Sequence, residues 1–174
     1  MRYLRYIALA VCLLSLQSCK NSFAIFSGKY PVRYRCDVSV PPYNTATSLG
    51  VFLSVRQSGA SLVVTDNDGV ESRYPMTQME SKDFILGLGG LILGTPALDN
   101  PDCVIYAYDL ACPVCERAST RVTFSNTGEA RCPSCHTVFD LNNNGFVIAS
   151  DRDDTRPLFR YPVSRMGMQV IVSN

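Results

Sequence analysis

Residues 112–135 read CPVCERASTRVTFSNTGEARCPSC, and a Cys-Pro-x-Cys turn stands at each end of this stretch. Each turn offers a pair of thiols, and two Cys-x-x-Cys pairs separated by about 15–20 residues form a known metal-site pattern. Four thiolates that meet around one centre give tetrahedral sulfur coordination. We therefore expect a metal to be bound by Cys112, Cys115, Cys132 and Cys135.

The segment between the two turns is too poor in apolar residues to form a core of its own. It holds one short apolar strand, 122–124, and a turn at Asn126-Thr127-Gly128. A metal would supply the missing cross-link, since zinc contributes roughly 10–16 kcal/mol in small zinc peptides. Disulfides are the alternative, because an oxidising compartment can close Cys112 to Cys115, or join the two turns, without any metal.

The sequence around this segment predicts short strands and turns. Residues 32–40 alternate apolar and polar side chains, which suits a half-buried strand. The glycines of 84–94 indicate a bulge or a close backbone approach, and Ile92 stands where a dinucleotide fingerprint needs glycine. The only helical candidate is 75–82. Further strands are expected at 50–56, 61–65, 104–110, 121–124, 146–149 and 169–172. The predicted class is all-β, an antiparallel sandwich or partly open barrel.

Composition limits the size and the function of the protein. The 174 residues suit roughly one domain, and 16 Lys and Arg balance 15 Asp and Glu. No basic stripe with interleaved aromatic residues is present, so we expect no nucleic-acid partner. The single histidine, His136, excludes a multi-histidine metal site, and no arrangement of residues resembles a catalytic triad.

The N-terminus has the pattern of an export signal. Arg2 and Arg5 precede an apolar stretch at 6–16, which is shorter than a membrane span, and Leu16-Gln17-Ser18-Cys19 follows. These four residues resemble a bacterial lipobox. We predict a lipoprotein signal peptide at 1–18, lipidation of Cys19, a tether at 19–30 and the folded domain at 31–174. The alternative is ordinary secretory cleavage after residues 22–24. The protein would be an exported, membrane-anchored lipoprotein of a bacterial cell envelope.

Two cysteines and one charged segment lie outside this pattern. In an exported protein, Cys36 and Cys103 are expected to form a disulfide, and two separate buried thiols are the alternative. Residues 151–154, Asp-Arg-Asp-Asp, are expected to form a solvated loop rather than a cation site.

Residues 107–140 resemble the cluster-binding lobe of Rieske iron–sulfur proteins. That family has a C-x-H motif, an interval, and C-P-x-H-G-S followed by a Phe-Asp pair. Cys112 and Cys132 match the family's cysteines, Thr137 its hydroxyl position, and 139–140 its Phe-Asp pair. Residues 156–163 are similar to the family's return strand, so the resemblance covers about 84–172. It implies a Rieske-like fold with an inserted knuckle lobe at 111–141, of rubredoxin or zinc-ribbon type, in an exported lipoprotein like those of Bacteroides-type bacteria.

Both cluster histidines of that family are replaced here. Val114 and Cys135 occupy their positions, and His136 stands where the family has glycine. Two imidazoles on one iron raise a Rieske potential, so a normal Rieske centre is excluded. The four thiolates could hold zinc, a single iron as in rubredoxin, or a four-Cys [2Fe–2S] cluster. His136 would replace Cys135 as the fourth ligand or donate a hydrogen bond to a ligand, and an exposed loop histidine is the alternative. Thr137 would donate a hydrogen bond to a site sulfur, and a plain turn residue is the alternative.

Two functions fit these residues. The first is an iron-centred electron carrier, or the electron-transfer subunit of an oxidoreductase, that catalyses no bond-making by itself. The second is a structural or binding module, held by zinc or disulfides, that recognises an envelope partner. No sequence feature identifies that partner.

Overall fold

The computed structural model describes residues 26–98, 100–154 and 156–174, and it confirms the all-β class. The largest sheet has six strands in the order β12-β7-β6-β2-β3-β4. These strands are Arg160–Tyr161, Tyr106–Asp109, Leu91–Thr95, Val51–Ser58, Ser61–Thr65 and Glu71–Pro75. Every neighbouring pair in this sheet is antiparallel, and the sheet stays open, because β12 and β4 form its two edges.

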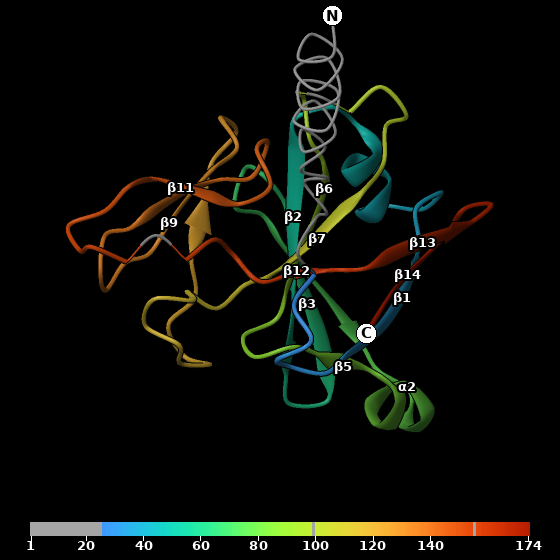
Figure 1. The fold of residues 1–174 in the computed structure, drawn as a ribbon. Coiled ribbons are helices and arrows are strands. Elements are labelled where there is room, and N and C mark those ends of the chain that lie inside the picture. The colour runs from blue at the N-terminus through green and yellow to red at the C-terminus, as the bar shows by residue number, and fades with distance from the viewer. Residues whose placement is uncertain (1–25, 99, 155) are drawn as a thin grey trace, which may run out of the picture.

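Two four-stranded antiparallel sheets accompany the large one. The first has the order β13-β14-β1-β5, from Val163–Met166, Gln169–Ser173, Val32–Asp37 and Ile85–Leu86. The second has the order β11-β10-β9-β8, from Phe146–Ala149, Val138–Asp140, Glu129–Arg131 and Thr123–Phe124. In Figure 1 the sheet of β11 to β8 stands to one side of the six-stranded sheet, and β1, β13 and β14 stand on the other.

The six-stranded sheet is buried on both faces in its central strands. Four consecutive residues of β2, 52–55, are buried, and so are all five residues of β6. Leu53 and Leu93 belong to a cluster shared with β1 and β14, whereas Phe52 and Ile92 belong to a cluster shared with the cysteine turns. The protein is therefore built in three layers with two separate cores.

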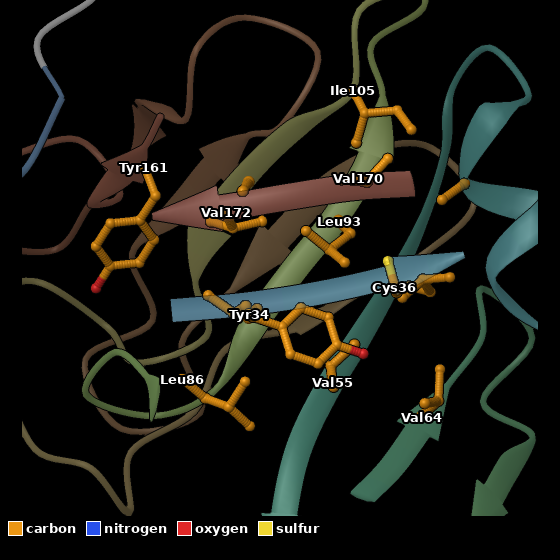
Figure 2. Close-up of a cluster of buried hydrophobic side chains, with 14 of the residues drawn as sticks. Tyr34, Cys36, Val55, Val64, Leu86, Leu93, Ile105, Tyr161, Val170 and Val172 are labelled. Atoms are coloured by element: carbon orange, nitrogen blue, oxygen red, sulfur yellow. The ribbon is translucent and has the colours of Figure 1, made fainter. Parts of the chain in front are cut away.

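The first core, which we call the sandwich core, lies between β1 and β14 and the six-stranded sheet. Strand β1 alternates buried and exposed residues as its sequence predicts, and Val32, Tyr34 and Cys36 point inward. Figure 2 shows β1 and β14 crossing the strands of the six-stranded sheet, with Tyr34, Leu93 and Val172 among the packed side chains. Most of this core is aliphatic, so its stability comes from apolar burial.

The second four-stranded sheet belongs to an insertion in the six-stranded sheet. Strands β7 and β12 are neighbours, so residues 110–159 leave and return at the same edge. We call residues 110–150 the lobe. Its last strand, β11, pairs with β10 and ends at Ala149.

Among the described residues, helical structure is confined to two short segments. The predicted helix appears as α2, Gln78–Asp83, which Thr77 and Glu80 open with a reciprocal capping box. A 3-10 helix, η2, covers Tyr43–Thr47 and was not expected from the sequence. In the part of the chain that the structure describes, neither helix has the length or the apolar character needed to span a membrane.

Candidate metal centre

The two Cys-Pro-x-Cys turns have the same backbone fold. The carbonyl of Cys112 accepts a hydrogen bond from the Glu116 amide at 2.8 Å, and that of Cys132 accepts one from the His136 amide at 3.1 Å. Glu116 and His136 both adopt a positive φ, 52° and 59°. Each turn therefore closes on a residue in the left-handed region and directs its two thiols to the same side.

Strands of the lobe hold each turn in place. The first turn follows β7. Ala111, just before the turn, forms an isolated β-bridge with Arg121, and the Cys112 amide donates a hydrogen bond to the Thr120 carbonyl at 2.9 Å. The second turn joins β9 to β10, and the Cys132 amide donates to the Thr137 carbonyl at 2.9 Å. The antiparallel pairing of β9 with β10 fixes the second turn, and the 111–121 bridge fixes the first.

The four cysteine sulfurs meet as one group. All four Sγ atoms lie within 4.8 Å of one another. Cys112 Sγ is 3.6 Å from Cys135 Sγ, and Cys115 Sγ is 3.8 Å from Cys132 Sγ. Cys115 is half-buried and the other three are buried. The structure thus brings together the four residues that the sequence singles out.

The chemistry of this group suits a soft or borderline metal ion. The set contains four thiols and neither a carboxylate nor an imidazole, as zinc and iron sites of the Cys₄ type require. Zn–S bonds of about 2.3 Å place tetrahedral sulfurs about 3.8 Å apart, close to the two contacts above. The residues present therefore fit a metal held by four thiolates.

Hydrogen bonds distinguish the sulfurs of the second turn. The backbone amides of Ser134 and Cys135 donate to Cys132 Sγ at 3.4 and 3.5 Å. The Thr137 hydroxyl lies 3.2 Å from Cys135 Sγ, and Thr137 is completely buried. Donors of this kind stabilise the thiolate form and reduce its charge density.

The pKa values of the facing thiols Cys112 and Cys135 are shifted in opposite directions. Burial raises the pKa of Cys112 and of Cys115 above the usual range for a thiol. Burial also acts to raise the pKa of Cys135, but the Thr137 hydroxyl and amide and the thiols of Cys132 and Cys112 outweigh it and lower this pKa to about 6.

The two residues after the second turn lie in different surroundings. The Thr137 hydroxyl contacts the sulfur of Cys135. The His136 side chain is exposed, and its Nδ1 lies 3.3 Å from Asp151 Oδ2 at the surface. His136 thus matches the alternative of an exposed loop histidine, and residues 151–153 are exposed as predicted.

The expected disulfide between Cys36 and Cys103 is absent, which corrects that prediction. Both residues are free thiols: Cys36 is buried on β1, and Cys103 is exposed in the turn before β7 at a φ of 50°. Burial in the sandwich core raises the pKa of Cys36 to about 12, so this thiol behaves as an apolar core residue. The cysteines of the two turns are also free thiols.

Asp109, the last residue of β7, is a structural residue that the sequence analysis missed. Its carboxylate is fully buried and accepts hydrogen bonds from the amides of Leu88, Gly89 and Ala111 and from the Tyr161 hydroxyl, at 2.6–2.9 Å. The Asp109 carboxylate therefore connects residues 88–89 and β12 to Ala111, the residue before the first cysteine turn. The only hint in the sequence is an acidic residue inside a predicted strand.

One cavity lies away from the four cysteines of the two turns. It has a volume of about 290 Å³ and is lined by residues of β1, β4, α2 and neighbouring segments, among them Tyr34, Tyr43 and Tyr74. None of the four cysteines of the two turns contributes to the lining of this cavity. The candidate metal centre is therefore packed among the side chains of the lobe and does not open into this cavity.

Comparison with known proteins gives three findings. A family described as a domain of unknown function (DUF8512) matches residues 110–150, and no curated protein matches the chain. Among solved structures, a Sphingomonas yanoikuyae B1 ferredoxin matches with a TM-score of 0.39 and 16% identity, over 82% of this chain and 98% of that chain. The family match coincides with the lobe, from the residue after β7 to the residue after β11.

Proposed function

We propose that the lobe holds a single zinc ion and that this ion is structural, so that the protein is a metal-stabilised binding module. The observation that carries the proposal is the convergence of the four sulfurs within 4.8 Å of one another. This arrangement supplies four ligands and leaves no position for a substrate, as in closed structural zinc sites.

The spacing of the sulfurs favours one ion over a two-iron cluster. In a [2Fe–2S] centre the irons lie on either side of bridging sulfides, so thiolates on different irons are separated by the whole length of the core. Here every pair among the four Sγ atoms lies within 4.8 Å, which suits four ligands on one tetrahedral ion and leaves no pair separated by the length of a two-iron core.

The position of the cysteines in the lobe supports a structural role. Cys112, Cys132 and Cys135 belong to the buried cluster of the lobe, together with Phe139 and Leu141. The lobe strands are only two to four residues long. Such short strands bury little apolar surface, and an ion that joins four chain positions would replace part of the missing core.

A one-iron electron carrier is the second candidate, and one observation favours it. Cys115 is half-buried while the other three ligands are buried, so one thiolate approaches the surface, where an electron could pass to a partner. The Rieske-like residue pattern of 107–140 supports iron in the same way. Iron bound by four thiolates would supply one-electron chemistry, and the chain would supply ligands, burial and hydrogen bonds.

Elemental analysis and an absorption spectrum of anaerobically purified protein test both candidates. We expect one zinc per chain and a colourless solution. One iron per chain with visible sulfur-to-iron absorption would support the electron carrier and contradict the zinc site. Acid-labile sulfide would indicate an iron–sulfur cluster. Full-length protein with no metal, in which Cys112, Cys115, Cys132 and Cys135 all titrate as free thiols, would contradict the proposal.

We further propose that the domain is tethered to a membrane of the bacterial envelope through lipid on Cys19, where it would meet an envelope partner. Cys19 lies outside the described residues, so the support is the lipobox-like sequence before it. The Cys19→Ser variant should leave the membrane fraction, because a single acyl chain or none binds membranes only weakly. Cys12→Ser, inside the apolar stretch, is the control and should stay membrane-bound. Equal fractionation of the two variants would disprove lipidation.

A further inference from the structure

A chain of three hydrogen bonds leads from the loop after β11 to the sulfur of Cys135. The Arg152 amide lies 3.1 Å from Ser150 Oγ, Ser150 Oγ lies 3.1 Å from Thr137 Oγ1, and Thr137 Oγ1 lies 3.2 Å from Cys135 Sγ. Ser150 is 13 residues from Thr137 in the sequence, and the lobe sheet brings the two hydroxyls together.

The two ends of this chain fix the direction of donation. The Arg152 amide can only donate, so the Ser150 oxygen accepts that bond and its own hydrogen is free for Thr137. A metal-bound thiolate can only accept, so the Thr137 hydrogen points to Cys135 Sγ. With both ends fixed, all three donors point toward the sulfur, and each bond in such a chain strengthens the next.

The register of the lobe sheet makes this contact a built feature. Val138 of β10 pairs with Ala149 of β11, so the next position along each strand brings Thr137 opposite Ser150. Thr137 is completely buried and Ser150 is half-buried. Water therefore has little access to the Thr137 hydroxyl, and a donor from the protein has to orient it.

We propose that Ser150 is a positioning residue that holds the Thr137 hydroxyl as a donor to the Cys135 thiolate. This inference rests on the proposed metal centre. Without Ser150, the Thr137 hydroxyl loses the donor that saturates its oxygen and rotates away from the sulfur in part of the population. Cys135 then becomes the more electron-rich ligand and reacts faster with electrophiles, and the loop at 150–154 thereby controls the reactivity of one ligand.

Cobalt(II) serves as a spectroscopic probe of this inference in the full-length protein. The Ser150→Ala variant should shift the sulfur-to-cobalt charge-transfer bands to longer wavelength, in the direction of a Thr137→Val variant. The Ser150→Ala/Thr137→Val double variant should shift them no further than Thr137→Val alone, because both changes remove the same donor. Ser150→Thr keeps a hydroxyl and should restore the spectrum. Alkylation of Cys135 by iodoacetamide should accelerate about tenfold in Ser150→Ala, because the thiolate loses its hydrogen-bond donor in part of the population.

Ser125→Ala is the matched control. It removes a hydroxyl from a hydroxyl pair in the same lobe, Ser125 with Thr127 at 2.8 Å, which is exposed. The control should have the wild-type cobalt spectrum and alkylation rate. Ser150→Ala protein that binds cobalt with an unchanged spectrum would overturn the inference and leave the metal centre standing. Wild-type protein that shows no tetrahedral cobalt bands would overturn the proposed function, and this inference with it.

Discussion

The sandwich core and the lobe bury their residues in different ways. The sandwich core packs aliphatic side chains and tyrosines between β1 and β14 on one side and β2 and β6 on the other. The lobe core has three cysteines among its buried residues and strands of two to four residues. In the sandwich core the stabilisation from apolar burial is distributed over many contacts. In the lobe the proposed metal centre concentrates the stabilisation at the four thiols. The two regions should therefore respond differently to the loss of one cysteine.

Loss of one sulfur ligand should have the largest effect, and it should be confined to the lobe. In Cys132→Ala three thiols remain, so the proposed ion is lost together with the binding free energy that holds the two turns. Hydrogen exchange should show loss of protection in residues 110–150 while β1, β2, β6 and β14 keep theirs.

Cys36→Ala is the matched control for that variant, because it removes a buried thiol from the sandwich core. It should lower the free energy of unfolding by about 1 kcal/mol and leave the metal content unchanged. Global unfolding of Cys132→Ala, or the same exchange pattern in both variants, would show that the two regions are not independent.

Asp109 lies where the two regions meet, so Asp109→Asn should weaken both. The amide nitrogen of asparagine would face donors from Leu88, Gly89, Ala111 or Tyr161. We expect a loss of about 3 kcal/mol in the free energy of unfolding, measured by urea denaturation, because buried donors lose a charged acceptor.

Asp140→Asn is the control for the loss of a carboxylate. Asp140 is half-buried and its side chain accepts one described hydrogen bond, from the Asn142 amide at 2.9 Å. The control should lose less than about 1 kcal/mol. If Asp109→Asn behaved in the same way, the carboxylate would not be what joins the lobe to the sheet.

The smallest effect is expected from a single hydrogen bond across the boundary. Tyr108 of β7 is fully buried and donates to the Leu141 carbonyl of the lobe at 3.0 Å. Tyr108→Phe should lower the free energy of unfolding by about 1–2 kcal/mol, because the carbonyl stays buried without that donor. Tyr106→Phe, two residues earlier and half-buried, has no described hydroxyl bond to lose and should change it by less than about 0.5 kcal/mol. Equal effects would mean that the bond contributes nothing.

Local patterns predicted much of this structure. Alternation in 32–40 gave β1, the runs at 61–65 and 146–149 gave β3 and β11 with those bounds, and the helix expected at 75–82 is α2 at 78–83. The glycines of 84–94 were expected to permit a close approach, and a Cβ on Gly87 would lie 2.3 Å from Asp109 Oδ2. These features depend on neighbours in the chain, which a sequence displays directly.

The sequence by itself determined the donor set of the lobe, because thiol chemistry and the spacing of two Cys-x-x-Cys turns depend only on the chain. It did not determine the state of Cys36 and Cys103, since a disulfide depends on how two strands are placed in space. The tertiary structure alone decided that the four sulfurs meet, that Asp109 joins the lobe to the sheet, and that Ser150 reaches Thr137. The physical reason is that these contacts join positions far apart in the chain, and the register of the sheets sets them.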